Sequence, residues 1–278
     1  MKRILIALAV LLAVQVADAQ TKTPDAAKKA LVSAEAASQD AKKAAKVATW
    51  TKLASAYMDA YNAPVGNAWV GASKQELQLL MGNDKPTATE EAVVEGVPYI
   101  KEIYADKELY FNGNGQLAII KVTNPVVEDA LAGALEAYKK AYEVDLKKSK
   151  VKDITVGLET IAQKYLDEGM TSYQFGDLAK ASENFEKAAI AAATEPCSKV
   201  DTTAIYNAGF TAWAVKDYER AKKFFEQCLE AGYYYEGGEV FAKLGDVYTN
   251  LGDAKKGAEI LEQGFVKFPQ SQSILIGL

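Results

Sequence analysis

The sequence has no histidine and only two cysteines among its 278 residues. The chain therefore lacks the side chain that enzymes use most often for proton transfer near neutral pH, and proteins most often for metal binding. Two cysteines are also too few for a structural zinc site made of cysteine and histidine ligands. These absences exclude histidine-based catalysis and argue against a metal centre, and we expect no cofactor.

An excess of basic residues and long apolar runs are missing as well. The chain has 32 Lys and Arg against 37 Asp and Glu, a net charge of −5 and a pI near 5.1. Nucleic-acid-binding domains need a basic face, so we expect no nucleic-acid partner. After residue 19, no apolar stretch approaches the roughly 18–20 residues of a membrane-spanning helix. We therefore expect no transmembrane segment in the mature chain.

The N-terminus has the features of a secretory signal peptide. Two basic residues precede the apolar run Ile4–Val14, and Ala17-Asp18-Ala19 fits a small-x-small cleavage site. No cysteine follows that site to carry a lipid anchor. We predict that residues 1–19 are cleaved and that the protein, beginning at Gln20, is periplasmic or secreted. An uncleaved membrane anchor and an association with the outer membrane remain open alternatives.

Export would permit a disulfide between Cys197 and Cys228. The sequence does not supply the Cα separation that a disulfide requires. Cys228 lies in a helical apolar pattern, where a small buried hydrophobic residue also fits. The pairing stays open at this stage.

The second half of the chain repeats one pattern when three glycines are aligned. In each segment a bulky residue lies four positions before the glycine, and a second helical stretch with small and bulky residues follows a turn that contains aspartate. The spacing between segments is roughly 34–40 residues. The aligned residues are Tyr165, Gly169, Ala181, Phe185 and Ala188, then Ile205, Gly209, Ala221, Phe225 and Cys228, then Phe241, Gly245, Tyr248, Leu261 and Gly264.

These segments resemble tetratricopeptide (TPR) repeats. The resemblance implies a mainly α fold, a TPR-type α-solenoid of antiparallel helix pairs, with three units over residues 153–270. Glu168 and Ser172 depart from the leucine and tyrosine that the pattern expects. Residues 271–278 resemble the start of a further helix, so we expect the chain to be a fragment of a longer repeat protein. The rival interpretation is that this apolar end docks into a partner subunit.

A fourth, split unit is expected over residues 49–146. Trp50, Leu53, Ala54 and Tyr57 fit the first helix of a TPR unit, and Ala134, Tyr138 and Ala141 fit the second. The chain between them, at about residues 63–125, changes character and is predicted to be an α+β insert. Two unrelated helices are the open alternative. Residues 20–48 are rich in Ala and Lys and predict a helix beginning at Thr23-Pro24.

The insert predicts one short helix and three strands. Ser73 and Glu76 form a capping box at the start of the helix. Three segments rich in Tyr, Ile and Val follow, and Asn112-Gly113-Asn114-Gly115 between the last two is a hairpin signal. We therefore expect a three-stranded antiparallel meander, formed by Tyr99–Tyr104, Glu108–Phe111 and Gln116–Val122.

The TPR resemblance implies a concave groove lined by the first helix of each unit, which binds a peptide or protein. The groove would be aromatic at its middle and polar at one end, which suits an apolar peptide segment of another envelope protein. The alternative is that the chain's own N-terminal helix or insert covers these side chains. Projected onto this sequence, the groove residues are Leu166, Met170, Tyr173, Tyr206, Phe210, Trp213, Ala242, Asp246, Thr249 and Asn250.

A second hypothesis is a glycan- or small-ligand-binding module that uses the insert and the loop Tyr233–Tyr235. Acidic pairs such as Glu90-Glu91 are not placed in a pocket by any pattern, and the basic run Lys147–Lys152 predicts a solvated loop. No set of residues meets the requirements of an active site. We therefore expect a non-catalytic scaffold with no catalytic residues.

Overall fold

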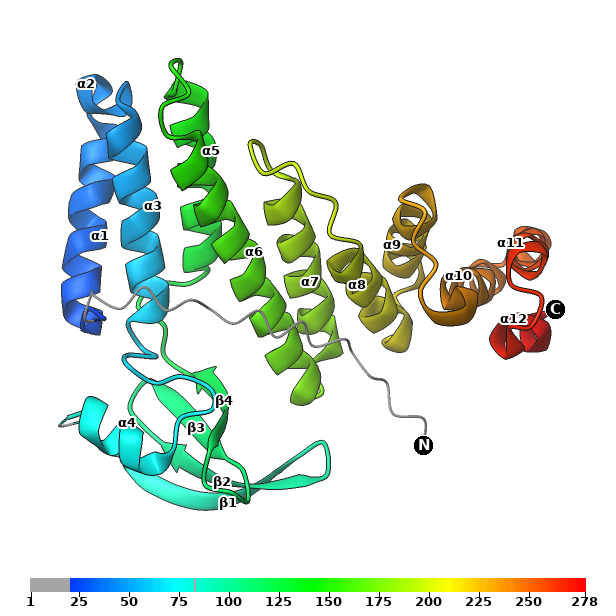
Figure 1. The fold of residues 1–278 in the computed structure, drawn as a ribbon, viewed down its shortest axis with the longest axis horizontal. Helices are drawn as coiled ribbons and strands as arrows, with labels where there is room; N and C mark the ends of the chain where they lie inside the picture. The colour runs from blue at the N-terminus through cyan, green and yellow to red at the C-terminus, as the bar shows by residue number, and fades with distance from the viewer. Residues whose placement is uncertain (1–20, 83) are drawn as a thin grey trace.

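The computed structural model describes residues 21–82 and 84–278, so the predicted signal peptide lies outside the described residues. Helices predominate, and one antiparallel sheet lies to one side of them (Figure 1). The described chain begins with α1 (Pro24–Gln39), α2 (Ala41–Ala44) and α3 (Val47–Asn62). Helix α1 starts at the predicted position, where the Thr23 side chain accepts a hydrogen bond from the Ala26 N–H and Pro24 occupies the first turn.

Helix α3 packs against α5 (Ala130–Val144), although more than sixty residues separate them in the sequence. The two helices run antiparallel (Figure 1). Gly133 permits this close approach, since a Cβ there would come within 2.5 Å of the Tyr57 ring. These two helices therefore pack together although the insert separates them in the sequence.

The insert consists of α4 (Lys74–Leu80) and four strands in sequential antiparallel order. Helix α4 has the predicted capping box, and one face of the sheet packs against it through Leu77, Leu109 and Phe111. The predicted hairpin is also present, because Asn112 Oδ1 accepts hydrogen bonds from the backbone of Asn114 and Gln116 at 3.0 and 3.1 Å. The strands are β1 (Ala88–Val94), β2 (Val97–Ile103), β3 (Lys107–Phe111) and β4 (Leu117–Val122).

The prediction of three strands was wrong, because β1 is a fourth strand at the edge of the sheet. Most of its side chains, including Glu90 and Glu91, are exposed, so the strand lacks the apolar alternation by which strands are recognised. Glu95 and Gly96 join β1 to β2, and both have positive φ angles, 50° and 78°. Two such residues in succession make the tight turn of a two-residue hairpin. Pairing with β2 therefore makes this segment a strand, not its own pattern.

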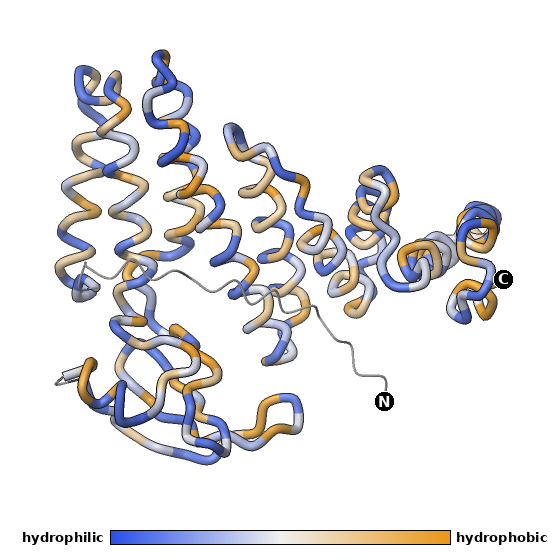
Figure 2. The backbone as a smooth tube through the Cα atoms, in the orientation of Figure 1, coloured by the Kyte–Doolittle hydropathy of each residue, from blue (hydrophilic) through white to orange (hydrophobic). Residues whose placement is uncertain are grey.

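The C-terminal half is a succession of helices that pack on their neighbours in chain order. Hydrophilic and hydrophobic residues alternate along these helices, as in amphipathic helices (Figure 2). The predicted turns are present, and Asp177 and Asp253 each cap the helix that follows. The helices are α6 (Val151–Gln174), α7 (Leu178–Ala193), α8 (Thr202–Ala214), α9 (Tyr218–Glu230), α10 (Glu239–Asn250), α11 (Ala254–Lys267) and α12 (Gln272–Gly277), with a short 3₁₀ helix at Glu236–Gly238.

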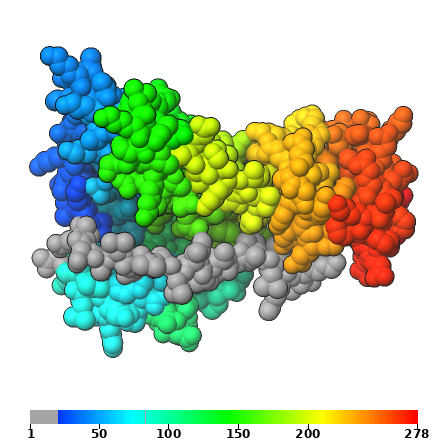
Figure 3. Space-filling view, turned by 45° about the horizontal axis from the view of Figure 1, so that its top comes forward, coloured from blue at the N-terminus to red at the C-terminus, as the bar shows by residue number. Residues whose placement is uncertain are grey.

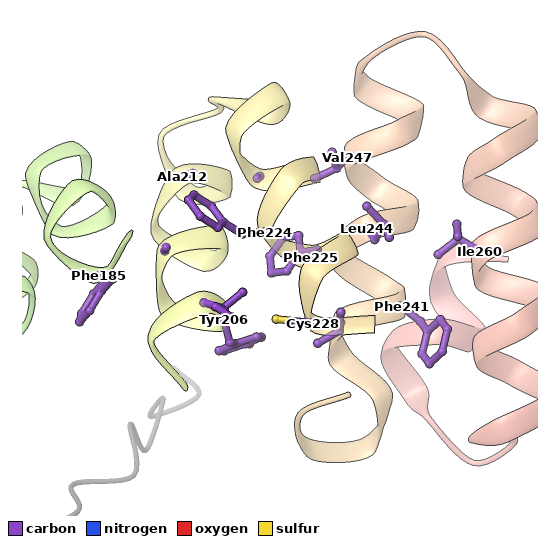
Figure 4. Packing of buried hydrophobic residues seen from close by; sticks show 14 of the residues in the cluster. Phe185, Tyr206, Ala212, Phe224, Phe225, Cys228, Phe241, Leu244, Val247 and Ile260 are labelled. Atoms are coloured by element: carbon purple, nitrogen blue, oxygen red, sulfur yellow. The ribbon is translucent and has the colours of Figure 1, made fainter. Parts of the chain in front are cut away.

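Small residues allow close contact within each helix pair. A Cβ at Gly169 would lie 2.6 Å from the Phe185 ring, and one at Gly245 would lie 2.7 Å from Leu261. The largest apolar cluster joins α7 to α12 and includes Cys228 (Figure 4). Burial raises the pKa of the Cys228 thiol to about 12, and both Cys197 and Cys228 are free thiols. The open question of a disulfide is thus answered by two unpaired cysteines in this structure.

Within residues 21–82 and 84–278, none of the helices combines the length and the apolar character needed to cross a bilayer.

Candidate partner-binding surface

The structure brings the predicted groove residues of α6 and α8 onto one apolar cluster. Leu166, Met170 and Tyr173 of α6 are half-buried and pack against it, as do Phe210 and Trp213 of α8. The five side chains from the two helices therefore share one apolar cluster.

Tyr206 lies deeper than its predicted role requires, with 6% of its surface exposed. The ring of Tyr235 stacks on it with centroids 4.2 Å apart, and Tyr233 meets its edge at 6.2 Å. Burial is the main cause of the raised pKa of Tyr206. Figure 4 shows Tyr206 as a member of the buried cluster. Tyr206 is therefore a buried residue. The loop Tyr233–Tyr235 covers it, rather than the N-terminal helix or the insert.

Trp213 is held by two charged side chains of α10. Its indole N–H donates to Asp246 Oδ2 at 2.6 Å, and Lys243 Nζ lies 3.4 Å from the ring centroid. The Phe210 ring lies beside it, with centroids 6.0 Å apart. Lys243 also pairs with Glu239 at 3.5 Å. We use the name aromatic surface for the residues Phe210, Trp213, Tyr233 and Tyr235 together with Lys243 and Asp246.

At the predicted polar end of the groove, Asp246, Thr249 and Asn250 of α10 are exposed, whereas Ala242 is half-buried. Asn250 Nδ2 donates to Asp246 Oδ1 at 3.1 Å and to its backbone carbonyl at 2.9 Å. This bond orients the carboxylate that in turn accepts from Trp213. Asn250 and Asp246 therefore fix the indole ring, and Ala242 and Thr249 flank them on the same helix.

A cleft of about 450 Å³ opens between the β1–β2 hairpin and the turn that joins α6 to α7. Tyr173 lines this cleft and also packs on the cluster beneath the aromatic surface. Burial and the nearby Glu95 carboxylate raise the pKa of Tyr173. The remaining lining residues include Val93, Val94, Phe175 and Leu178.

The sheet is anchored beside this cleft by one aromatic side chain of the helices. Phe175 meets the edge of the Tyr110 ring at 5.3 Å, and Lys121 Nζ lies 4.7 Å from its centroid. The insert therefore forms one wall of the cleft at the end of α6.

Sequence reasoning missed Lys243 and assigned the tyrosine loop to a different site. The spacing of Glu239, Lys243 and Asp246 at i, i+4 and i+7 is a signal that places all three on one face of α10. No sequence signal places the β1–β2 hairpin at the cleft. Val93 and Glu95 come close to the end of α6 only because the sheet packs against the helices.

Residues 202–231 match the family model of the tetratricopeptide repeat. The chain contains a TPR repeat. The matched residues are α8 and α9, so Phe210 and Trp213 lie on the first helix of this TPR repeat. No curated protein matches the chain.

Proposed function

We propose that this protein is an exported, non-catalytic TPR scaffold that binds a peptide segment of another envelope protein. TPR repeats are protein-interaction modules, and the match at α8 and α9 supports this class of function. In the proposal, the helix pairs form an α-solenoid and the aromatic surface lies on its concave face. The observation that carries the proposal is the pair of half-exposed rings, Phe210 and Trp213, on the first helix of the matched repeat.

The chemistry of this surface suits an apolar peptide flanked by polar groups. Aromatic rings offer a large contact area with few rotatable bonds, so little side-chain entropy is lost on binding. Asp246 and Lys243 already fix Trp213, which reduces that cost further. Leu166, Met170 and Tyr173 extend the apolar area toward the cleft.

The experiment is affinity capture from an envelope extract, followed by titration of the captured protein. The variant is the double substitution Phe210→Ala and Trp213→Ala, and Tyr206 is left intact because its removal would open the core. We expect the double variant to bind at least tenfold more weakly, since two aromatic anchors typically carry much of an interface's binding energy.

The matched control is Phe265→Ala, which removes a partly exposed ring on α11. It should leave the dissociation constant unchanged, and circular dichroism should show that both variants are folded. Equal binding by the wild type and the double variant would refute the aromatic surface as the site. N-terminal sequencing of the secreted protein tests the export part of the proposal, with Gln20 as the expected first residue.

The glycan-binding alternative has weaker support. Tyr234 stacks on Phe241 with centroids 5.5 Å apart, and Tyr235 stacks on Tyr206. Stacking within the chain occupies ring faces that a sugar would use. Binding to a glycan array that is lost on Tyr233→Ala but kept in the Phe210 and Trp213 double variant would favour the alternative.

A further inference from the structure

Lysines gather at one end of the N-terminal half of the molecule. Helices α3 and α5 pack antiparallel, so the start of α3 and the end of α5 lie at the same end (Figures 1 and 3). Residues 40–46 hold three lysines and one aspartate, and residues 145–152 hold four lysines and one aspartate. We use the name basic end for these two segments; its lysines are Lys42, Lys43, Lys46, Lys147, Lys148, Lys150 and Lys152.

The two carboxylates of the basic end accept hydrogen bonds from backbone N–H groups. Asp40 caps α2 by accepting from the N–H groups of Lys42 and Lys43 at 2.9 and 3.0 Å. Asp145 is buried and accepts from the N–H groups of Ser149 and Lys150 at 3.0 and 2.7 Å. Both aspartates thus accept hydrogen bonds from backbone N–H groups, and neither forms a salt bridge with a lysine of the basic end.

Two acidic residues next to these segments pair with single lysines. Lys150 pairs with Asp153 at 2.8 Å, and Lys140 pairs with Glu143 at 2.7 Å. Within the part of the chain that the structure describes, the other exposed lysines of the basic end form no salt bridge; they are Lys42, Lys43, Lys46, Lys147, Lys148 and Lys152. The basic end is therefore strongly cationic on a chain whose net charge is −5.

An exposed leucine lies among these lysines. Leu146 is 89% exposed and directly precedes Lys147 in the loop between α5 and α6. Lys148 Nζ lies 3.5 Å from the centroid of the Tyr142 ring, which ties the loop to α5. Because the Leu146 side chain is exposed, its burial does not contribute to the stability of the fold. Insertion where lipid headgroups meet acyl chains would remove its apolar surface from water.

We propose that the basic end docks on an anionic phospholipid membrane surface. The lysines bind phosphate headgroups, and Leu146 inserts at the level where headgroups meet acyl chains. Clusters of four to eight lysines are typical of proteins that bind anionic lipids. Leu146 favours a membrane over a soluble polyanion, because a polyanion has no apolar region for an aliphatic side chain. The basic end is distant in sequence from the aromatic surface, so this inference does not depend on the proposed function.

The test is flotation of the full chain with vesicles of phosphatidylcholine alone or with phosphatidylglycerol added. Variant 1 replaces Lys42, Lys43, Lys147 and Lys148 by Gln. The matched control replaces four exposed lysines elsewhere by Gln, with the same change in net charge: Lys85, Lys180, Lys216 and Lys255. Residues 1–20 are identical in all variants, so the compared proteins differ only in the substituted lysines.

We expect variant 1 to bind phosphatidylglycerol vesicles at least tenfold more weakly than the wild type, and the control to change less than twofold. Leu146→Asn should weaken binding about threefold or more, and added salt should weaken wild-type binding. Equal binding by variant 1 and the control would overturn the proposal. Heparin binding that depends on the four lysines, without vesicle binding, would also overturn it and assign the basic end to a soluble polyanion.

Discussion

At the residue scale, a small set of polar contacts links α7, α8 and α9 in addition to their apolar packing. Between α7 and α9, Glu186 accepts from Arg220 at 2.5 Å and from Lys223 at 2.6 Å. Arg220 also donates to Ser182, whose hydroxyl donates to the Ala208 carbonyl of α8. Burial alone would raise the pKa of Glu186, but Lys223 and Arg220 outweigh it and hold that pKa below its usual value. The ionised form of Glu186 therefore stabilises the folded state.

We predict that Glu186→Gln lowers the free energy of unfolding by about 1–2 kcal/mol at about pH 7. Because the folded-state pKa is depressed, this stabilisation is complete above the unfolded-state pKa and is lost as pH falls through the folded-state pKa. Urea unfolding of both proteins should therefore converge at acidic pH. Glu219→Gln, at an exposed pair with Lys222, is the control and should change stability by less than about 0.5 kcal/mol. A difference as large in acid as at neutral pH would show that packing, not charge, is responsible.

At the element scale, the insert is fastened to the helices rather than tethered as a separate module. Phe175 follows the last residue of α6 and contacts both Tyr110 of β3 and Lys121 of β4. Val94 of β1 belongs to the same small cluster. The position of the β1–β2 hairpin, and with it the wall of the cleft, depends on this contact.

We predict that Phe175→Ala loosens the sheet while leaving the helices intact. Hydrogen exchange in residues 88–103 should become at least tenfold faster, because the ring that fixes the sheet face is gone. The exchange of α8 and α9 should not change. Phe265→Ala, on α11, is the control and should leave the sheet protected. Unchanged exchange in β1 and β2 would mean that α4 alone holds the sheet in place.

At the scale of the whole molecule, the helices from α6 onward pack mainly on their neighbours in the chain, so we expect their stability to be local. The N-terminal helices α1, α3 and α5 share one set of contacts, and α10, α11 and α12 share another. A defect at one end should therefore open that end first.

We predict that Gly245→Ala destabilises the C-terminal helices selectively. The new Cβ would lie 2.7 Å from Leu261, which is buried, so the two helices must move apart at a cost of about 1–3 kcal/mol. Hydrogen exchange should rise in residues 239–277 and stay unchanged in α3 and α5. Gly113→Ala, where a Cβ meets no atom within 4 Å, is the control. A uniform rise over all helices would instead indicate one cooperative unit.

The sequence alone determined the features that local chemistry controls. Thr23, Ser73 and Asp177 cap helices wherever they precede an amphipathic stretch, and the spacing of Gly169, Gly209 and Gly245 marks where helices approach closely. These signals lie within a few residues of their effect, so the helix pairs and the Asn112–Gly115 hairpin could be predicted.

Only the tertiary structure decided which segment forms the edge of the sheet and which side chains are buried by other segments. Strand β1 forms because β2 offers backbone partners, and its exposed side chains carry no pattern of their own. Tyr206 is buried because Tyr235, from a loop almost thirty residues away, stacks on it. Likewise, Lys243 meets Trp213 only when α8 and α10 come together. These contacts join distant segments across a fold, and a pattern in one segment does not determine which surface another segment will cover.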